Sequence, residues 1–352
     1  MKEKCVSAPL YHSTPIPLRP YRLLCLLCLL GEERAAAERE GESARPPSAV
    51  PRPHREDFLR DLLTQLRATP DHPLALVCNA GDVFAYQEPG TEDDSPEGAE
   101  YNTKRDLDIL RAMDLVPGCV MPARALLHRL QHTITTVKGV CGYEACTAAA
   151  WRGCARANTG FYERGVRLPM DEILPVRSDA ERAREKEESL AAMRRADTIT
   201  IRPHLLLCAV CQYGSGIRPP LDADNLPELV ALILEKPQTR ITLVRGADWM
   251  ICAPCKRRVA ALNACVNVWG TGGLSNELRD LNVLQHLGLT YGTTMPAAEL
   301  FRLLFERLPT TAPVCAKDNA KPSAWWDPCG DRKSGNPHYV IGRQMLQAAG
   351  LG

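Results

Sequence analysis

The chain has 352 residues, of which 45% are hydrophobic and 24% are charged, close to the average of globular proteins. This composition excludes a wholly disordered chain, a fibre and a multi-span membrane protein. The formal net charge is +1, so there is no excess positive field to attract nucleic acid or an anionic membrane. The unusual feature is the content of 15 cysteines, and their spacing is the main source of functional information.

Three pairs of cysteines have two residues between them: Cys25 and Cys28, Cys208 and Cys211, and Cys252 and Cys255. This spacing lets both sulfurs reach one metal ion or one edge of a cluster within a single turn of the chain. The overall cysteine density is below that of a small disulfide-stabilised domain. The sequence therefore favours metal binding over a disulfide framework.

The first apolar segment, residues 22–30, is similar to the core of a secretory signal and is too short to span a bilayer as a helix. No small-residue cleavage site follows it. It has an internal counterpart at residues 205–210, where no signal peptide can lie. We therefore expect a buried element that carries two thiols, in a cytoplasmic protein where disulfides are disfavoured.

An internal repeat relates the two halves of the chain. The pattern Asn-x-x-Arg-Asp-Leu at residues 102–107 recurs at residues 276–281, with an offset of 174 residues. The N-terminal part of each half follows an offset of 183, because the first half has a longer insertion rich in Glu, Arg, Ala and Pro. Five cysteines align in this repeat: Cys25 with Cys208, Cys28 with Cys211, Cys78 with Cys252, Cys141 with Cys315, and Cys154 with Cys329.

In chain order, the periodicity predicts a strand at 73–77, a capped and exposed helix at 178–197, a helix at 225–236, a strand at 239–244, and helices at 276–287 and 296–308. The expected fold is α+β and predominantly helical, with two tandem related modules of short strands and cysteine-bearing loops. The expected boundaries are an N-terminal extension (1–16), a first cysteine module (17–160), a charged helical linker (161–199), a second cysteine module (200–335) and a C-terminal tail (336–352).

Three short sequence motifs occur in a recognisable order in the second module. Arg202-Pro203-His204 opens the segment that leads to Cys208, a Gly-x-Asp sequence precedes the Cys252 and Cys255 pair, and a further cysteine stands at position 265. Over residues 200–308 the chain resembles a family of uncharacterised bacterial and archaeal proteins that open with Arg-Pro-His-His-Leu-Leu-Cys. The resemblance implies an iron–sulfur cluster without an established activity. The ligands that it implies are Cys208, Cys252, Cys255 and Cys265.

The repeat indicates a different ligand set from the resemblance. One interpretation takes the cysteines shared by both modules as ligands, so that both modules bind metal. The other takes the family set in the second module and regards the first module as degenerate, and we favour this second interpretation. The candidate metal ligands are therefore Cys208, Cys252, Cys255, Cys265, Cys211, Cys315 and Cys329 in the second module, and Cys25, Cys28, Cys78, Cys141 and Cys154 in the first.

Four thiolates suit either an iron–sulfur cluster or a zinc ion. Mainly on the resemblance, we favour a cluster with an electron-transfer or redox-sensing role, served by a redox partner protein and without nucleic-acid or membrane partners. The alternative is a non-redox scaffold with structural four-cysteine zinc sites. No spacing indicates a catalytic nucleophile or acid–base pair, and His204, Asp106 and Asp280 are expected to be structural.

Overall fold

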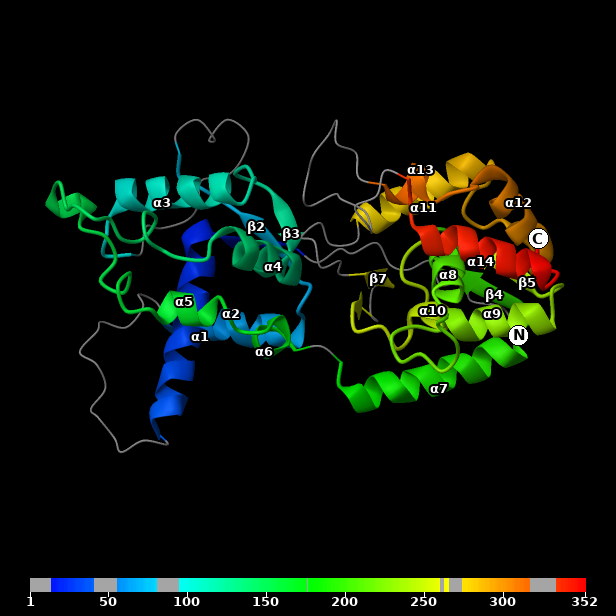
Figure 1. The fold of residues 1–352 in the computed structure, drawn as a ribbon. Coiled ribbons are helices and arrows are strands. Elements are labelled where there is room, and N and C mark those ends of the chain that lie inside the picture. The colour runs from blue at the N-terminus through cyan, green and yellow to red at the C-terminus, as the bar shows by residue number, and fades with distance from the viewer. Residues whose placement is uncertain are drawn as a thin grey trace. The chain divides into compact units, whose positions relative to one another are not determined.

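The computed structural model describes residues 14–40, 56–80, 95–175, 177–259, 263–265, 274–316 and 334–352 (Figure 1). The chain divides into two compact units: the first unit is His12–Pro175, and the second unit contains Val176–Gly352. Helices predominate in both units and the strands form small mixed sheets. This confirms the predicted α+β, predominantly helical class. Among the described helices, none is both long enough and apolar enough to cross a membrane.

The first unit is built from short strands between amphipathic helices. In α2, for example, apolar side chains recur every three or four residues and give the helix one buried face, while acidic residues occupy its first turn. The elements of this unit are β1 (Ile16–Leu18), α1 (Pro20–Glu40), α2 (Glu56–Ala68), β2 (Pro73–Leu76), α3 (Ala99–Ala112), β3 (Val120–Pro122), α4 (Ala123–Thr133), the 3-10 helix η2 (Ala149–Trp151), α5 (Phe161–Gly165) and α6 (Met170–Ile173).

The second unit begins with the charged helix whose capping box is formed by Ser178 and Glu181. The predicted helices and strands between residues 225 and 308 are confirmed to within two residues at each end. The elements are α7 (Asp179–Arg195), β4 (Thr198–Ile201), α8 (His204–Gly214), α9 (Leu226–Glu235), β5 (Arg240–Leu243), α10 (Trp249–Cys252), β6 (Arg258–Val259), β7 (Ala264–Cys265), α11 (Leu274–Leu287), β8 (Thr294–Pro296), α12 (Ala297–Arg307), α13 (Ala312–Cys315) and α14 (Pro337–Ala348).

Each unit contains a three-stranded sheet with the same strand order and directions. In the first unit β1 pairs parallel with β2, and β2 pairs antiparallel with β3. In the second unit β4 pairs parallel with β5, and β5 pairs antiparallel with β8. The central strand of each sheet faces a methionine across the antiparallel pair, at Leu74–Met121 and at Ile241–Met295. The helix that follows the first strand, α1 or α8, carries the first two cysteines of its unit.

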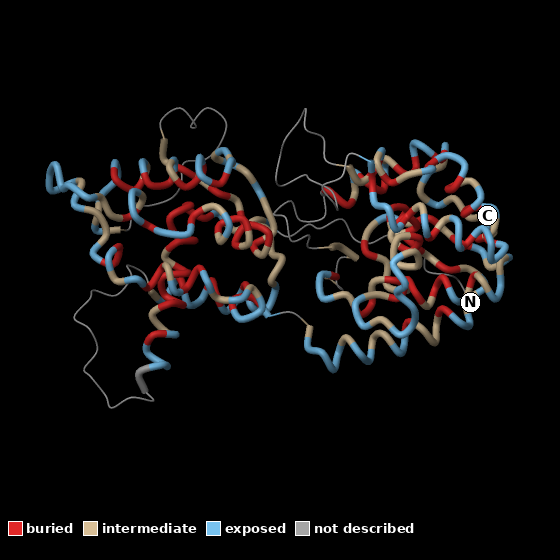
Figure 2. Tube along the Cα trace, viewed as in Figure 1, coloured by how far each residue is buried: buried red, intermediate tan, exposed pale blue. Residues whose placement is uncertain are grey.

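The apolar segment at residues 22–30 is a buried part of α1. Six of these nine residues are leucine and two are cysteine, and a helix that is apolar on every side is stable only inside a core. Figure 2 shows the buried residues gathered in the interior of each unit, where each has its own hydrophobic core. The buried start of α1 therefore holds Cys25 and Cys28 at the edge of the first core.

Close contacts between glycines join the first cysteine helix of each unit to a later helix. A Cβ atom on Gly31 of α1 would overlap the carbonyl oxygen of Phe161, and one on Gly165 would overlap that of Leu27. Gly214 of α8 and Gly342 of α14 make the same kind of contact in the second unit. The backbones approach this closely only because these positions lack a side chain.

These contacts place the unit boundaries differently from the sequence prediction. Helix α5 belongs to the first unit and not to a linker, because it packs on α1. Helix α7 belongs to the second unit. The segment predicted as a C-terminal tail contains α14, which packs on α8 and buries Tyr339.

We predict that Gly31→Ala destabilises the first unit by about 1–3 kcal/mol, because the added methyl group forces α1 and α5 apart. The measurement is urea unfolding combined with amide hydrogen exchange along α1. Ala37→Ser, on an exposed position of the same helix, is the control and should leave exchange in α1 within experimental error. Equal exchange rates in the two variants would refute the role of this contact.

Candidate functional site

A cavity of about 160 Å³ in the first unit brings four thiols together. Cys25 and Cys28 line it from α1, where a spacing of three residues places both side chains on one side of the helix. Cys141 and Cys154 line it from the segment between α4 and α5. Most of the remaining lining is apolar. The structure therefore collects four of the five cysteines predicted for the first module.

The two loop cysteines are held by hydrogen bonds to one carbonyl group. The carbonyl oxygen of Cys141 accepts the backbone N–H of Cys154 at 2.8 Å and the hydroxyl of Tyr101 at 2.7 Å. The intervening Gly153 has a φ of 86°, a conformation that other residues adopt only with strain, and it lies directly against this carbonyl. These contacts fix the backbone on which both thiols stand.

Three arginines line the cavity: Arg22, Arg105 and Arg156. The Arg105 guanidinium of α3 is buried and donates to the sulfur of Cys141 at 4.0 Å. Arg156 hydrogen-bonds the sulfur of Cys28 and forms an ion pair with Glu32. A guanidinium near a sulfur stabilises the thiolate form.

Burial opposes ionisation of the same thiols. It raises the pKa of Cys25, Cys28 and Cys141 above the ordinary value. The pKa of Cys154 rises to about 12, because burial and the nearby Cys25 both disfavour its thiolate. Without a bound cation these four groups are therefore neutral thiols at physiological pH.

A second group of thiols lies in the second unit. Cys252 ends the short helix α10, whose first turn is capped by Asp248 through a hydrogen bond from the backbone N–H of Met250. Burial raises the pKa of Cys252, and Cys255 and Cys265 lie close enough to raise it further as thiolates. The structure therefore groups three of the four ligands that the family resemblance implies.

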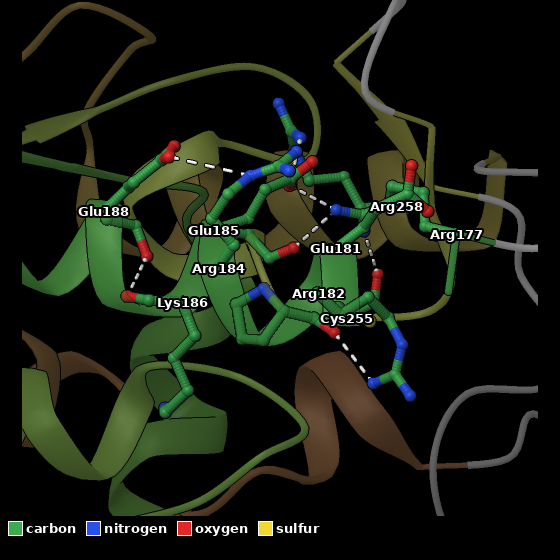
Figure 3. Close-up of polar contacts among 12 residues, drawn as sticks. Arg177, Glu181, Arg182, Arg184, Glu185, Lys186, Glu188, Cys255 and Arg258 are labelled. Atoms are coloured by element: carbon green, nitrogen blue, oxygen red, sulfur yellow. Dashed lines mark hydrogen bonds and ion pairs between the residues drawn. The ribbon is translucent and has the colours of Figure 1, made fainter. Parts of the chain in front are cut away.

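Two arginines donate hydrogen bonds to the backbone carbonyl oxygens of the turn between Cys252 and Cys255. Figure 3 shows helix α7 beside this turn, with Arg177 and Arg182 directed toward it. Arg177 donates to the carbonyl oxygens of Ala253 at 2.7 Å and Cys255 at 2.6 Å, and Arg182 donates to that of Pro254 at 3.3 Å. The helix predicted as an exposed connection thus fixes the backbone of a cysteine turn.

The other cysteines of the second unit form a pattern like that of the first. Burial raises the pKa of Tyr339, and the nearby Cys211 and Cys315 act in the same direction. In the first unit Cys28 and Cys141 act in the same way on Tyr162. Cys208 lies one turn before Cys211 on α8, at the surface of the second core. Cys329 lies outside the described residues.

Cys78 does not line the cavity of the first unit. It follows β2 by two residues and lies near the buried ion pair of Arg19 and Asp106. Its predicted counterpart Cys252 lies in α10, nine residues beyond β5. The two cysteines therefore occupy different places relative to the equivalent strands.

A buried carboxylate joins the start of each cysteine helix to a later helix. Asp280 of α11 accepts two hydrogen bonds from Arg202, one from the backbone N–H of His204 at 2.9 Å and one from His204 Nδ1 at 2.7 Å. Asp106 of α3 accepts from Arg19 and from the backbone N–H of Tyr21. Both carboxylates therefore have the structural role that was expected, although they lie within their helices and not at the start.

Protonation of His204 is disfavoured in the folded protein. Burial lowers the pKa of its imidazole, and the Asp280 carboxylate offsets part of this effect. The hydrogen bonds from His204 and Arg202 lower the pKa of Asp280 despite its burial. The pair is therefore an ionised aspartate that accepts a hydrogen bond from a neutral histidine.

Sequence reasoning missed the arginines around both thiol groups. Arg105 belongs to the repeated Asn-x-x-Arg-Asp pattern, which was a usable signal, whereas Arg156 and Arg177 stand in no recognisable motif. Within the described part of the chain, no three His, Cys, Asp or Glu side chains are placed closely enough to hold a metal ion directly. The four thiols of the first unit instead surround a cavity.

The chain matches no protein-family model, no curated protein and no solved structure. The resemblance based on Arg202-Pro203-His204 and the following cysteines therefore stays a prediction.

We predict that Arg177→Gln destabilises the second unit by about 1–3 kcal/mol, since the carbonyl groups of Ala253 and Cys255 lose a charged donor. Hydrogen exchange of the amides between residues 250 and 258 should accelerate. Arg184→Gln in α7 is the control, because Arg184 is 66% exposed and forms a surface ion pair with Glu188. If both variants behave alike, α7 does not hold the turn.

A second prediction concerns acid stability. Unfolded His204 gains its proton near pH 6.5, whereas the folded residue stays neutral to lower pH, so the free energy of unfolding should fall as the pH drops below about 6.5. His204→Asn keeps a donor for Asp280 and removes the titration, so its stability should depend less on pH between 7 and 5. Denaturant unfolding at several pH values tests this. His286→Asn, at an exposed position of α11, is the control and should retain the slope of the unaltered protein.

Proposed function

We propose that the protein binds a thiolate-ligated metal centre in the first unit, an iron–sulfur cluster with an electron-transfer or redox-sensing role. The observation that carries this proposal is the convergence of four thiols on one cavity: Cys25, Cys28, Cys141 and Cys154. This departs from the interpretation favoured from the sequence, in which the first module is degenerate. The four cysteines belong to the set shared by both modules, which also includes Cys78.

The chemistry of these residues fits such a centre. Four thiolates are the usual ligands of a cluster, and an apolar lining limits access of water, which tunes the reduction potential. The metal would replace the thiol protons, which explains how thiols with raised pKa values can serve as ligands. Arg105 and Arg156 would offset part of the negative charge of four thiolates.

The arrangement favours a cluster over a single zinc ion. Tetrahedral zinc with Zn–S bonds of about 2.3 Å brings its sulfurs to within about 3.8 Å of one another. Here the thiols instead surround a cavity of about 160 Å³, comparable to a protein cavity of about 150 Å³ that accepts benzene. A space of this size suits a polynuclear centre.

A structural zinc site is a second candidate function, at Cys252, Cys255 and Cys265. These residues lie on a tight turn and on the two-residue strand β7, in a part of the chain with little hydrophobic core of its own. A metal in such a loop would replace missing packing. Cys208 would be the fourth ligand under the family assignment.

We also propose that the two units arose by duplication and that the protein acts in the cytoplasm with a redox partner. The shared strand order and the equivalent Arg19–Asp106 and Arg202–Asp280 ion pairs support the duplication. A cytoplasmic location accords with the free thiols and with the absence of a membrane-crossing helix among the described residues.

Anaerobic reconstitution followed by iron, sulfide and zinc analysis tests the centre. The unaltered protein should take up iron and sulfide and absorb broadly near about 400 nm, with bleaching by dithionite. Cys141→Ser should lose the iron of this centre, because a cavity ligand is missing. Cys146→Ser, an exposed cysteine of the same loop, should retain full loading.

The same experiment tests the second thiol group, Cys252, Cys255 and Cys265. Cys255→Ser should leave the iron unchanged and lower only the zinc content. Stoichiometric zinc in a colourless unaltered protein would contradict the cluster. Equal iron loading in Cys141→Ser and Cys146→Ser would contradict its location in the first unit.

A further inference from the structure

Arg105 is a buried cation at the wall of the cavity. Its side chain is 1% exposed and its guanidinium stacks on the ring of Tyr21 at 4.0 Å from the centroid. One terminal nitrogen donates to Asn102 Oδ1 and the other to the Cys141 sulfur. Tyr101 lies on another side of the guanidinium at 5.2 Å. The position of the charge is therefore fixed by groups on several sides.

This arginine differs from Arg19 and Arg156, two other buried arginines of the unit, in forming no ion pair with a carboxylate among the described residues. Arg19 pairs with Asp106, and Arg156 pairs with Glu32. Among the described residues, Arg105 forms no ion pair with a carboxylate, and its Nε has no hydrogen-bond acceptor. The aromatic rings and the amide of Asn102 compensate only part of the charge.

A buried charge without a counter-ion is unfavourable. Cys25, Cys141 and Glu97 line the cavity together with Arg105, and all three interact electrostatically with its guanidinium. Thiolates bound to a metal centre would add negative charge beside the guanidinium, at the sulfur of Cys141. The contact with Cys141 therefore directs a buried positive charge at the proposed centre.

We propose that Arg105 is the positioning cation of the thiolate centre, donating to Cys141 and raising the reduction potential of the bound cluster. This inference rests on the proposed function. One electron from an external reductant adds one unit of negative charge to the cluster, and no bond forms or breaks. Arg105 keeps its proton and stabilises the more negative, reduced state by its proximity.

The other two arginines that line the cavity, Arg22 and Arg156, are less suited to this role. The Arg22 guanidinium lies over the rings of Tyr21 and Phe58, and it lowers the pKa of Cys25 less than Arg105 does. Arg156 reaches Cys28, but its charge is already paired with Glu32 and its ring contact is with Phe161. An ion pair has little net charge at a distance, so it changes the energy of an added electron less than an isolated guanidinium does. Arg105 is therefore the residue to test.

The test is a reductive titration of the reconstituted protein with dithionite, followed by electron paramagnetic resonance of the reduced state. Arg105→Gln should shift the potential to a more negative value, and Arg105→Lys should give an intermediate value because it keeps the charge without the planar donor. Arg129→Gln is the control, since Arg129 is a buried arginine of the same unit that does not line the cavity. Its potential should equal that of the unaltered protein.

The outcomes separate this inference from the proposed function. Failure of the unaltered protein to bind metal would overturn both. Normal iron loading with the same potential in Arg105→Gln would overturn only the role of Arg105. If Arg105→Gln does not fold, Arg105→Lys is compared with the unaltered protein instead. An unchanged reduction potential in Arg105→Lys would then refute the role of Arg105. If zinc is the native ion, the thiolate charge-transfer band of the cobalt-substituted protein replaces the potential. This band should shift to lower energy in Arg105→Gln. An unshifted band would refute the proposed role of Arg105.

Discussion

The placement of both cysteine helices depends on one interaction, a buried carboxylate that accepts hydrogen bonds from an arginine and from the first turn of the helix. Asp106 contacts Arg19 and Tyr21 in this way, and Asp280 contacts Arg202 and His204. Removing one member of a buried ion pair costs about 3–5 kcal/mol, because the other charge is left uncompensated. The carboxylate also satisfies a backbone N–H that the helix itself leaves unpaired. The junction between the first strand and the first helix of each unit therefore has one fixed geometry.

That geometry has direct consequences for the thiols. In the first unit, α1 is held at its start by Asp106 and in its middle by the close contact with α5 at Gly165. Cys25 and Cys28 lie between these two fixed points, so their side chains face the loop of Cys141 with little freedom. Because α3 supplies both Asp106 and Arg105, the residue that fixes the helix and the residue that faces the sulfurs are neighbours in sequence. The position of the charge is thereby coupled to the position of the ligands.

Sequence reasoning identified the elements whose signals are local. The helices at 274–287 and 297–307 have apolar periodicity with Gly or Pro at their boundaries. The metal-ligand role of the twelve candidate cysteines stays a prediction. The cavity was not predictable, because it brings Cys28 and Cys141 together across more than a hundred residues. The assignment of α5 to a linker failed for the same reason: its contact with α1 depends on two glycines far apart in sequence. A buried arginine such as Arg105 also has no sequence signature that distinguishes it from an exposed one.

The two thiol groups are placed in different physical environments, which argues for different roles. The cavity thiols lie among apolar side chains together with three arginines and Glu97, and the buried Arg105 donates to the Cys141 sulfur. An added electron would therefore interact with a nearby positive charge at low dielectric. The turn at Cys252 and Cys255 is instead held through its carbonyl oxygens by Arg177, just before α7, and by Arg182 of α7. Arg177 pairs with Glu185, and Arg182 pairs with Asp179. Those contacts fix the backbone and leave the charge near the sulfurs largely compensated. The first environment suits a centre whose charge changes, and the second suits one that only maintains the fold.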